Sequence, residues 1–489
     1  MQRRDILKIG GLAGLSLLLP WGTSSQAHAD AARFAGPYFL HLHASGGWDP
    51  TLFCDGKVAT ENLLDTDAVT KVELVNGVPV PTESKNGEYA LLSDGVKVES
   101  PKHFFQNQGK SFRVFNGVDT QTNNHETGVM AFGCGHNSTE LPAFAAMAAG
   151  KVALQQDVPM AFLAGGAYNF TGDVVALSRF DRDRIRNIAF PNRPDSNNAE
   201  SKFLPDLATQ EILAARTKRI AALQATENLP RTKRTLEALR EAQLGGSGLS
   251  LLADVLKDPD LTFDQIKGML PFQEQASLDY LNNGNRFVNL ARPVESILRC
   301  FAAGISVSAT YAMGGFDTHD NHDVNQMRAQ SNFVLTLRYV MQRAKELGIG
   351  DKLYVLVTSD FGRTPRYNMN RGKDHWNVTS ALLSGPGIAP ACIGASDAGH
   401  KPKRVSKTDV RAVLDDKDTN GLRIRASHLH REMRRILEVD KLDFAKKWPL
   451  PTGTGEDVLG LFSCVVSTPE RPLPSEAGVF RLKGGVILR

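Results

Sequence analysis

The chain has 489 residues, 42% of them hydrophobic, with 57 lysines and arginines against 53 aspartates and glutamates. The resulting formal charge of +4 leaves no electrostatic footprint for nucleic acid, so no nucleic-acid partner is expected. The length allows either one large α/β domain with insertions or two domains.

The first 29 residues have the composition of a twin-arginine export signal. Arg3 and Arg4 precede an apolar run over residues 9–19, and the small-residue triplet 27–29 resembles a cleavage site. The run is shorter than the roughly 20 apolar residues that span a bilayer. An amphipathic first helix of a cytosolic protein is the alternative, but the run has no polar face. We therefore expect the twin-arginine translocase and signal peptidase to deliver a periplasmic or extracellular chain that starts near Asp30 and has no membrane span.

The cysteines are few and scattered. None of the five lies in a CxxC motif, so neither a zinc knuckle nor a dense disulfide framework is indicated. One or two bridges remain possible, and the odd count leaves one thiol unpaired unless it pairs between chains.

Beyond the signal, strand-like apolar runs alternate with helical spacing. The expected core strands lie at 38–43, 112–115, 158–163, 306–311 and 353–357, and the expected helices at 141–150, 287–304 and 326–347. A polar excursion over 55–102 contains hairpin turns at Asn76-Gly77, Asn86-Gly87 and Asp94-Gly95. The charged, leucine-patterned segment 201–258 indicates a helical insertion or cap. The alternation predicts an α/β domain over 30–489, with a mostly parallel sheet and helices on both faces.

Three of these strands end in an aspartate within a glycine-bearing turn. They are Asp49, Asp317 and Asp360, and ligands of open α/β sheets gather at the carboxyl ends of strands. His319 follows Asp317 by two residues, so an extended backbone places both on one face, and His375 follows soon after the Asp360 loop. Aspartate after Gly-Gly is also a common turn residue, and each motif alone is weak. Together they predict a site for a divalent metal or an anion.

Several nearby polar residues have both a functional and a structural interpretation. Arg363 and Lys373 either hold an anionic group or are merely solvated. Asn124 and His125 lie on a loop suited to substrate or second-metal contacts, although asparagine-rich loops are common in turns. Two further histidines, His41 and His43, are interpreted as core residues and are left out of the site.

The motifs resemble those of the DUF1501 family of exported proteins, which is similar to the alkaline phosphatase and sulfatase superfamily. The resemblance rests on four segments: Gly46-Gly47-Trp48-Asp49, Gly315-Phe316-Asp317-Thr318-His319, Ser359-Asp360-Phe361-Gly362-Arg363-Thr364-Pro365 and Gly372-Lys373-Asp374-His375. It implies an alkaline phosphatase-like core. It also implies that the metal ligands, for zinc, manganese or calcium, are Asp49, Asp317, His319, Asp360 and His375.

The sequence departs from that superfamily at three points. Phe361 follows Asp360 where a histidine is usual, the spacing between Asp317 and His319 is shorter than usual, and Cys54 does not begin a sulfatase nucleophile motif. Thr51, two residues after Asp49, is a possible hydroxyl nucleophile, as is water.

Three functions follow as hypotheses. The first is a metal-dependent hydrolase of phosphate or sulfate esters, in which Arg363 or Lys373 neutralises the anion. The second is a non-catalytic exported protein that binds a cell-envelope glycan or protein. The third and weakest is an isomerase or transferase acting on a phosphorylated sugar.

Overall fold

The computed structural model describes residues 33–450 apart from 59–68, 85–86, 89–95, 138–140, 157, 181–199, 230–231, 233–254 and 256–260, together with residues 452 and 456. The predicted export signal, Cys464 and the expected turns at Asn86 and Asp94 fall outside these residues. No helix within the described part of the chain is long and apolar enough to cross a membrane.

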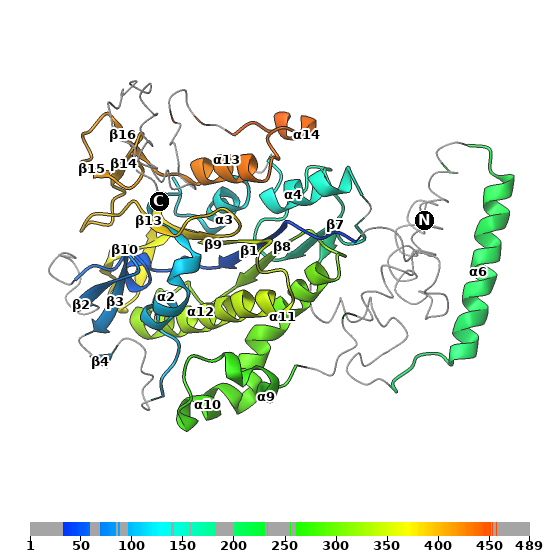
Figure 1. The fold of residues 1–489 in the computed structure, drawn as a ribbon, viewed down its shortest axis with the longest axis horizontal. Helices are drawn as coiled ribbons and strands as arrows, with labels where there is room; N and C mark the ends of the chain where they lie inside the picture. Colours follow the sequence, from blue (N-terminus) through cyan, green and yellow to red (C-terminus); the bar gives the residue numbers. More distant parts are fainter. Residues whose placement is uncertain are drawn as a thin grey trace, which may run out of the picture.

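An eight-stranded sheet forms the centre of the molecule, in the order β13-β5-β12-β9-β1-β8-β6-β7 (Figure 1). In chain order its strands are β1 (Tyr38–Ala44), β5 (Arg113–Asp119), β6 (Phe162–Gly165), β7 (Leu177–Arg179), β8 (Ser308–Met313), β9 (Leu353–Ser359), β12 (Val378–Ser384) and β13 (Ala391–Ile393). Among these strands only β12 runs antiparallel to its neighbours. The predicted mixed α/β class with a mostly parallel sheet is therefore confirmed.

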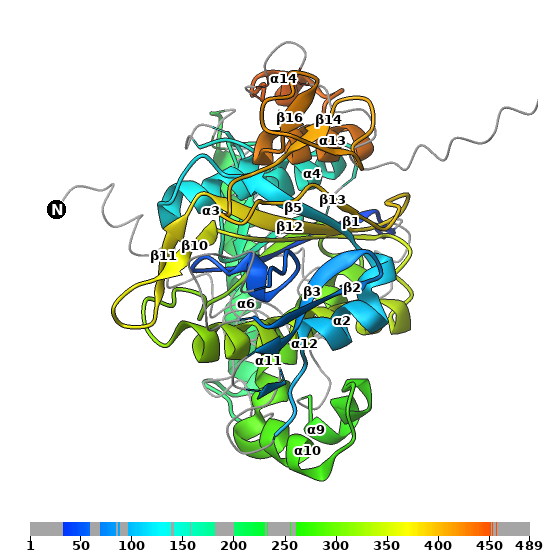
Figure 2. The same cartoon turned by 90° about the vertical axis from the view of Figure 1, so that its left-hand side faces the viewer.

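Helices cover both faces of this sheet, as Figure 2 shows. One face carries α2 (Pro101–Gln108), α11 (Arg286–Ala302) and α12 (His322–Glu346), and the other carries α3 (His125–Cys134), α4 (Phe144–Ala153) and α13 (Ala426–Ile436). Because both faces are covered, all seven residues of β1 are buried, which explains why the central strands are continuous apolar runs rather than alternating ones.

Several element boundaries differ by a few residues from the sequence prediction; α4, for example, begins at Phe144 and continues past Gly150, the last residue of the expected helix. The shifts of β6 and α12 have a clear physical reason. β6 begins at Phe162 rather than at 158, because Pro159 has no N–H to donate to a ladder and forms a turn with Met160. α12 begins at His322, one turn before the apolar spacing indicated. Its first turn is polar because His322 and Gln326 face the loop of Asp49 rather than the apolar core.

Smaller elements surround the sheet. The strands β2 (Lys71–Val75), β3 (Val78–Ser84) and β4 (Gly87–Glu88) form one small sheet, β10 (Gly362–Tyr367) and β11 (Lys373–Trp376) form a hairpin, and β14 (Arg404–Ser406), β15 (Val413–Leu414) and β16 (Gly421–Arg423) form a third sheet. The remaining α-helices are α6 (Asp206–Thr226), α9 (Phe263–Ile266), α10 (Gln275–Asn282) and α14 (Asp443–Lys446). The predicted turn at Asn76-Gly77 joins β2 to β3, and α6 lies within the segment predicted as a helical insertion.

The four cysteines that the structure describes are all free thiols. Burial raises the pKa of Cys300 and of Cys392 to about 12, so neither is a ready thiolate at neutral pH. No disulfide forms among Cys54, Cys134, Cys300 and Cys392, and the possible bridges left open by the sequence are absent from this set.

Two buried histidines on α13 predict how stability depends on pH. Burial lowers the pKa of His428 to about 4 and that of His430 to about 3, whereas an unfolded histidine titrates near 6.5. Below about pH 6.5 the unfolded chain therefore binds protons that the folded chain does not, and the free energy of unfolding should fall as the pH drops toward 4. The expected slope is about 1.4 kcal/mol per pH unit for each histidine.

Urea unfolding at a series of pH values measures this slope. His430→Gln should flatten the profile, because it keeps an N–H donor for the Phe132 carbonyl but cannot titrate. The matched control is His103→Gln at an exposed position of α2, which should leave the slope unchanged. Equal slopes in the wild type and His430→Gln would contradict the assignment.

Candidate metal centre

The carboxyl ends of β1, β8, β9 and β5 lie at the same edge of the sheet, because these strands run parallel to one another. Their following segments carry Asp49, Asp317, Asp360 and His125 respectively. Glycines allow the backbones to meet there. Gly46 has φ +119°, and a Cβ at this position would lie 2.4 Å from the Asp317 nitrogen, so no other residue fits between the two loops.

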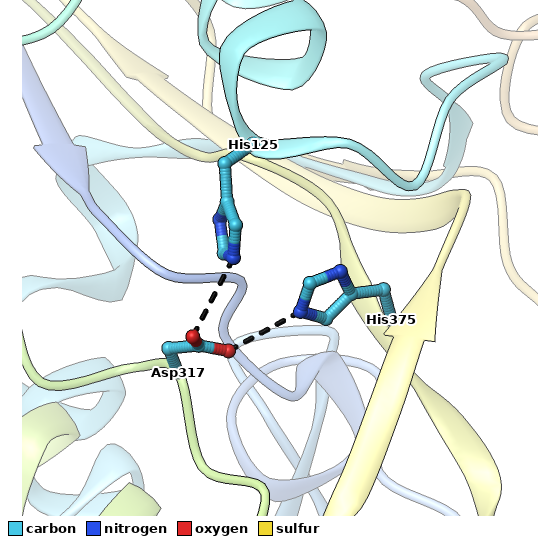
Figure 3. Close-up of side chains that lie close together, drawn as sticks. All are labelled: His125, Asp317 and His375. Carbon is cyan, nitrogen blue, oxygen red and sulfur yellow. Dashed lines mark hydrogen bonds and ion pairs between the residues drawn. The ribbon is translucent and has the colours of Figure 1, made fainter.

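Three side chains from different elements converge at this edge (Figure 3). His125 is the first residue of α3, Asp317 lies on the loop after β8, and His375 lies on β11. The His125 Nε2 atom is 3.5 Å from Asp317 Oδ2, and the His375 Nε2 atom is 3.2 Å from Asp317 Oδ1. One donor atom from each residue lies within 4.8 Å of the others, which is close enough for all three to share one ion.

His319 adds a fourth donor to this cluster. Its Nε2 atom lies 3.0 Å from Asp317 Oδ1 and 3.0 Å from His375 Nε2. Asp317, His319 and His375, predicted from the sequence as ligands of one site, are thus brought together by the structure. His125, predicted as a substrate contact, joins them, and we call these four residues the outer cluster.

Each of the three imidazoles has an acceptor oxygen at its Nδ1 atom. The Nδ1 atoms of His125, His319 and His375 face Asp360 Oδ2 at 2.6 Å, Asp374 Oδ1 at 3.2 Å and the Asn123 carbonyl at 2.9 Å. Carboxylate and carbonyl oxygens only accept, so each Nδ1 can donate its ring proton there and leave Nε2 as the atom that binds a cation. All three Nε2 atoms face Asp317, so either a ring proton or a cation lies between each of them and the carboxylate. Histidine ligands of metals usually donate from one ring nitrogen to an oxygen and bind the ion with the other.

The spacing of the donor atoms also fits a cation. Two lone pairs 3.0 Å apart repel each other unless a proton or a cation lies between them. Ligands of a tetrahedral zinc at about 2.0 Å lie about 3.3 Å from one another, and the distances from the three imidazoles to Asp317 are similar, at 3.0 to 3.5 Å. His319 lies outside the set of three residues whose donor atoms are all within 4.8 Å of one another. The outer cluster therefore has the donor chemistry of a metal site, and His125, Asp317 and His375 have the spacing of its core.

The outer cluster opens to solvent on one side and rests on buried side chains on the other. The side chains of Asp317 and His319 are 47% and 46% exposed, so a ligand can reach them. Beneath them Phe361 is fully buried and packs against the rings of His125 and His375, with centroids 4.9 and 4.3 Å away. Phe361, next to Asp360, thus packs on two imidazoles and supplies no metal ligand.

Arg363 is fully buried beneath Asp317. Its Nη2 donates to Asp317 Oδ1 at 2.7 Å and also bonds the carbonyls of Gly46 and Phe316, while Nε and Nη1 donate to the carbonyls of Gly47 and Lys373. Burial raises the pKa of Asp317, but the hydrogen bond and charge of Arg363 outweigh it and hold that pKa below its ordinary value. Arg363 therefore orients Asp317 from below and is buried away from solvent, where the sequence offered it as a residue that holds an anionic group.

Asp49, Thr51 and Lys373 form a separate buried group, which we call the inner group. Lys373 Nζ and His322 Nε2 each lie 2.9 Å from Asp49 Oδ2, and the Thr51 hydroxyl donates to Asp49 Oδ1 at 2.7 Å. Burial raises the pKa of Asp49, but Lys373 and His322 outweigh it and hold that pKa well below its ordinary value. The structure does not bring Asp49 or Thr51 to the outer cluster, and Lys373 is fully buried against Asp49.

Asp360 supports the outer cluster from behind. Its Oδ2 accepts from His125 Nδ1 and from the Gly46 nitrogen at 3.0 Å, and its Oδ1 lies 2.5 Å from His43 Nε2. Because His43 and His125 offset the cost of burial, the pKa of Asp360 lies below its ordinary value. Both oxygens are occupied by protein donors, so Asp360 orients a ligand where the resemblance implied that it would itself be one.

The sequence reasoning missed His43 and His322 and placed Asn124 differently. His43 lies one residue from the carboxyl end of β1, and this position was the available signal for a role at the site. His322 belongs to the first turn of α12, where the residues follow no apolar pattern. Asn124 caps α3, with its Oδ1 accepting from the Thr127 nitrogen at 3.2 Å, and thereby fixes the start of the helix at His125.

Several solved structures are similar to this chain at low identity. Alkaline phosphatase from the Antarctic bacterium TAB5 is 11% identical, with 74% of this chain and 94% of that chain covered at a TM-score of 0.29. The lipoteichoic acid synthase LtaP from Listeria monocytogenes is 9% identical, with 89% and 78% covered at a TM-score of 0.31. A Bacteroides thetaiotaomicron protein, described in work on the metabolism of multiple glycosaminoglycans, is 12% identical, with 87% and 76% covered at a TM-score of 0.28.

No curated protein sequence matches the chain. A family model does match part of it, over residues 280–421, and this part includes Asp317, His319, Asp360 and His375. The model is that of DUF1501, described as a protein of unknown function, and the family resemblance inferred from the motifs is confirmed over those residues.

Proposed function

We propose that the outer cluster binds a divalent metal ion and that the chain is an exported, metal-dependent hydrolase of phosphate or sulfate esters. The observation that carries the proposal is the convergence of three Nε2 atoms on Asp317, with an acceptor oxygen at each Nδ1 atom. His125, Asp317 and His375 would hold the ion, with His319 as the fourth donor.

The donor set favours some metals over others. Imidazole nitrogen suits zinc and other transition metals, whereas calcium prefers oxygen ligands only. Three nitrogens and one carboxylate therefore favour zinc or manganese, and they make calcium the least suitable of the three metals expected from the sequence.

A bound divalent ion would supply Lewis-acid chemistry, polarising an ester oxygen and activating water. The chain's own residues would hold the reacting groups in place. Arg363 keeps Asp317 ionised and oriented, and the exposed sides of Asp317 and His319 leave room for a substrate. Within the described residues no serine or threonine hydroxyl bonds the outer cluster, so water is the expected nucleophile. Two exposed arginines, Arg366 and Arg371, lie on the hairpin of His375 and supply positive charge for an anionic ester.

A second function has one observation in its favour. Thr51, Arg363 and Lys373, the three residues expected to act on substrate, are all buried. A chain with that arrangement can bind a metal without turning over an ester. The alternative is a non-catalytic exported protein that uses the outer cluster to bind a cell-envelope glycan or protein.

Metal analysis of the purified protein, followed by a substrate screen, separates these functions. The hydrolase should contain about one zinc or manganese ion per chain. It should hydrolyse an aryl phosphate, a phosphodiester or an aryl sulfate in the presence of that metal, and Asp317→Asn should abolish the activity. Stoichiometric metal without any turnover would support the binding function, and absence of metal after zinc or manganese loading would contradict both.

The export proposal has its own test. Replacing Arg3 and Arg4 together with lysine keeps the charge but removes the paired arginines that the twin-arginine translocase requires. We expect the variant to accumulate in the cytoplasm at its precursor length, while the wild type is found in the periplasm or medium in a shortened form. Cell fractionation and the mass of the intact protein measure both. If the variant and the wild type show the same location and the same length, export through the twin-arginine translocase is contradicted.

A further inference from the structure

A line of buried polar side chains leads from the outer cluster into the core of the sheet. His125 Nδ1 bonds Asp360, and the other oxygen of Asp360 bonds His43 Nε2. The Nδ1 atom of His43 lies 3.0 Å from the Thr358 hydroxyl, and His41 Nε2 lies 2.7 Å from the same hydroxyl. All members behind His125 are at most 2% exposed.

The proton positions along this line are mutually consistent. Because Asp360 only accepts, His43 donates from Nε2 and keeps a lone pair on Nδ1. The Thr358 hydroxyl then donates to His43 and accepts from His41 Nε2. Burial lowers the pKa of His41 well below its ordinary value, which agrees with a neutral ring. The order therefore starts at Asp360, which accepts from both His125 and His43, and the directions of the bonds at Thr358 and His41 follow from it.

The buried position of these residues means that a polar network in this place costs folding free energy. His41 and His43 lie on β1, and Thr358 lies on β9 directly opposite His43 in the parallel register. Apart from Ser359, which bonds the Ala44 carbonyl and the Trp48 nitrogen, the other residues of these strands are mainly apolar or aromatic, and a valine or leucine in place of His41, His43 or Thr358 would add no polar group to satisfy. Buried polar networks cost stability unless every member is bonded, and apolar replacements are often neutral. The network therefore adds little stability to the core beyond what apolar packing would supply.

We propose that Asp360, His43, Thr358 and His41 are positioning residues for His125. They hold its ring in one orientation and keep its proton on Nδ1, so that the Nε2 lone pair faces the metal. This inference rests on the proposed metal site and extends it to residues that never touch the ion. Outer partners of a ligating histidine typically change metal affinity by about 10- to 100-fold. Thr358 lies two bonds behind Asp360, so the lower end of that range is expected for it.

Thr358→Val tests the inference, since valine has nearly the same shape as threonine but has no hydroxyl to donate to His43 or to accept from His41. Zinc affinity, measured by chelator competition, should weaken about 10-fold. In the metal-free protein the imidazole nitrogen NMR shifts of His125 should move from their wild-type values, because His43 loses the hydroxyl at its Nδ1 atom and Asp360 is held less firmly. Thr358→Ser keeps the hydroxyl and should retain wild-type values. The matched control is Thr310→Val on β8, which is equally buried but bonds the Gly166 carbonyl.

The possible outcomes are distinct. If the wild type binds zinc and Thr358→Val matches it in zinc affinity and in the His125 nitrogen shifts, the positioning role is overturned and the metal site stands. If the wild type binds no zinc, the proposed function fails, and the positioning role in metal binding fails with it. Should Thr358→Val not fold, His41→Phe removes the terminal donor and keeps an aromatic ring, and the same two readouts apply. A variant that lowers only the thermal midpoint contradicts a positioning role.

Discussion

His375→Ala is expected to remove the metal from the purified protein. The substitution deletes the Nε2 donor that lies near both Asp317 and His319, and it leaves three ligands from two loops. The loss of affinity should exceed the roughly 10- to 100-fold that follows loss of an outer partner, because a direct ligand is lost. Elemental analysis after dialysis and a zinc-binding titration measure this effect, and any ester hydrolysis should fall with metal content.

Two comparisons make this result specific. His319→Ala should weaken zinc binding less than His375→Ala, because His319 lies outside the set of three residues that share mutual distances within 4.8 Å. His103→Ala, at an exposed position of α2, should bind zinc as the wild type does. If His375→Ala keeps stoichiometric zinc, the outer cluster is not the metal site.

Lys373→Met is expected to destabilise the fold by about 3 to 5 kcal/mol. Both Lys373 and Asp49 are fully buried, and removing one partner of a buried ion pair leaves the other charge without compensation. Because His322 and Thr51 still bond the Asp49 carboxylate, the loss should lie toward the lower end of the range. Urea unfolding measures the change in the free energy of unfolding.

The double variant Asp49→Asn with Lys373→Met supplies the control within the inner group. It removes both charges, so it should recover part of the stability lost in Lys373→Met. An exposed pair gives the external control: Lys97 lies 3.0 Å from Glu274 with both side chains 50% exposed, and Lys97→Met should cost less than about 1 kcal/mol. If Lys373→Met and Lys97→Met lower the free energy of unfolding equally, burial does not explain the cost of breaking the Lys373–Asp49 pair.

The sequence predicted the sheet well because its signals are local. Continuous apolar runs that end in Gly-Gly-x-Asp describe a buried parallel strand followed by a turn, and this pattern identified β1 and β8. The edge at which the ligands gather follows from strand direction alone. Sequence therefore placed Asp317, His319 and His375 near one another before any distance was known.

The division of roles among the aspartates could not be read in the same way. Asp49, Asp317 and Asp360 share one local pattern, yet one pairs with a lysine 324 residues away, one faces solvent and one bonds two histidines. The three aspartates differ in the partners that tertiary packing brings to each of them. The same holds for His43, whose apolar strand indicates a core residue until the position of Asp360 is known.

The β10–β11 hairpin carries side chains for both groups, with Lys373 pointing into the inner group and His375, two residues later, reaching the outer cluster. A two-stranded hairpin has little stability of its own, and this one is attached through the buried ammonium of Lys373. Two ligands, Asp317 and His125, belong to the sheet and its helices, whereas His375 belongs to a short appendage. Under the proposed function, changes confined to the roughly fifteen residues of this hairpin would alter the metal site and leave the central sheet intact.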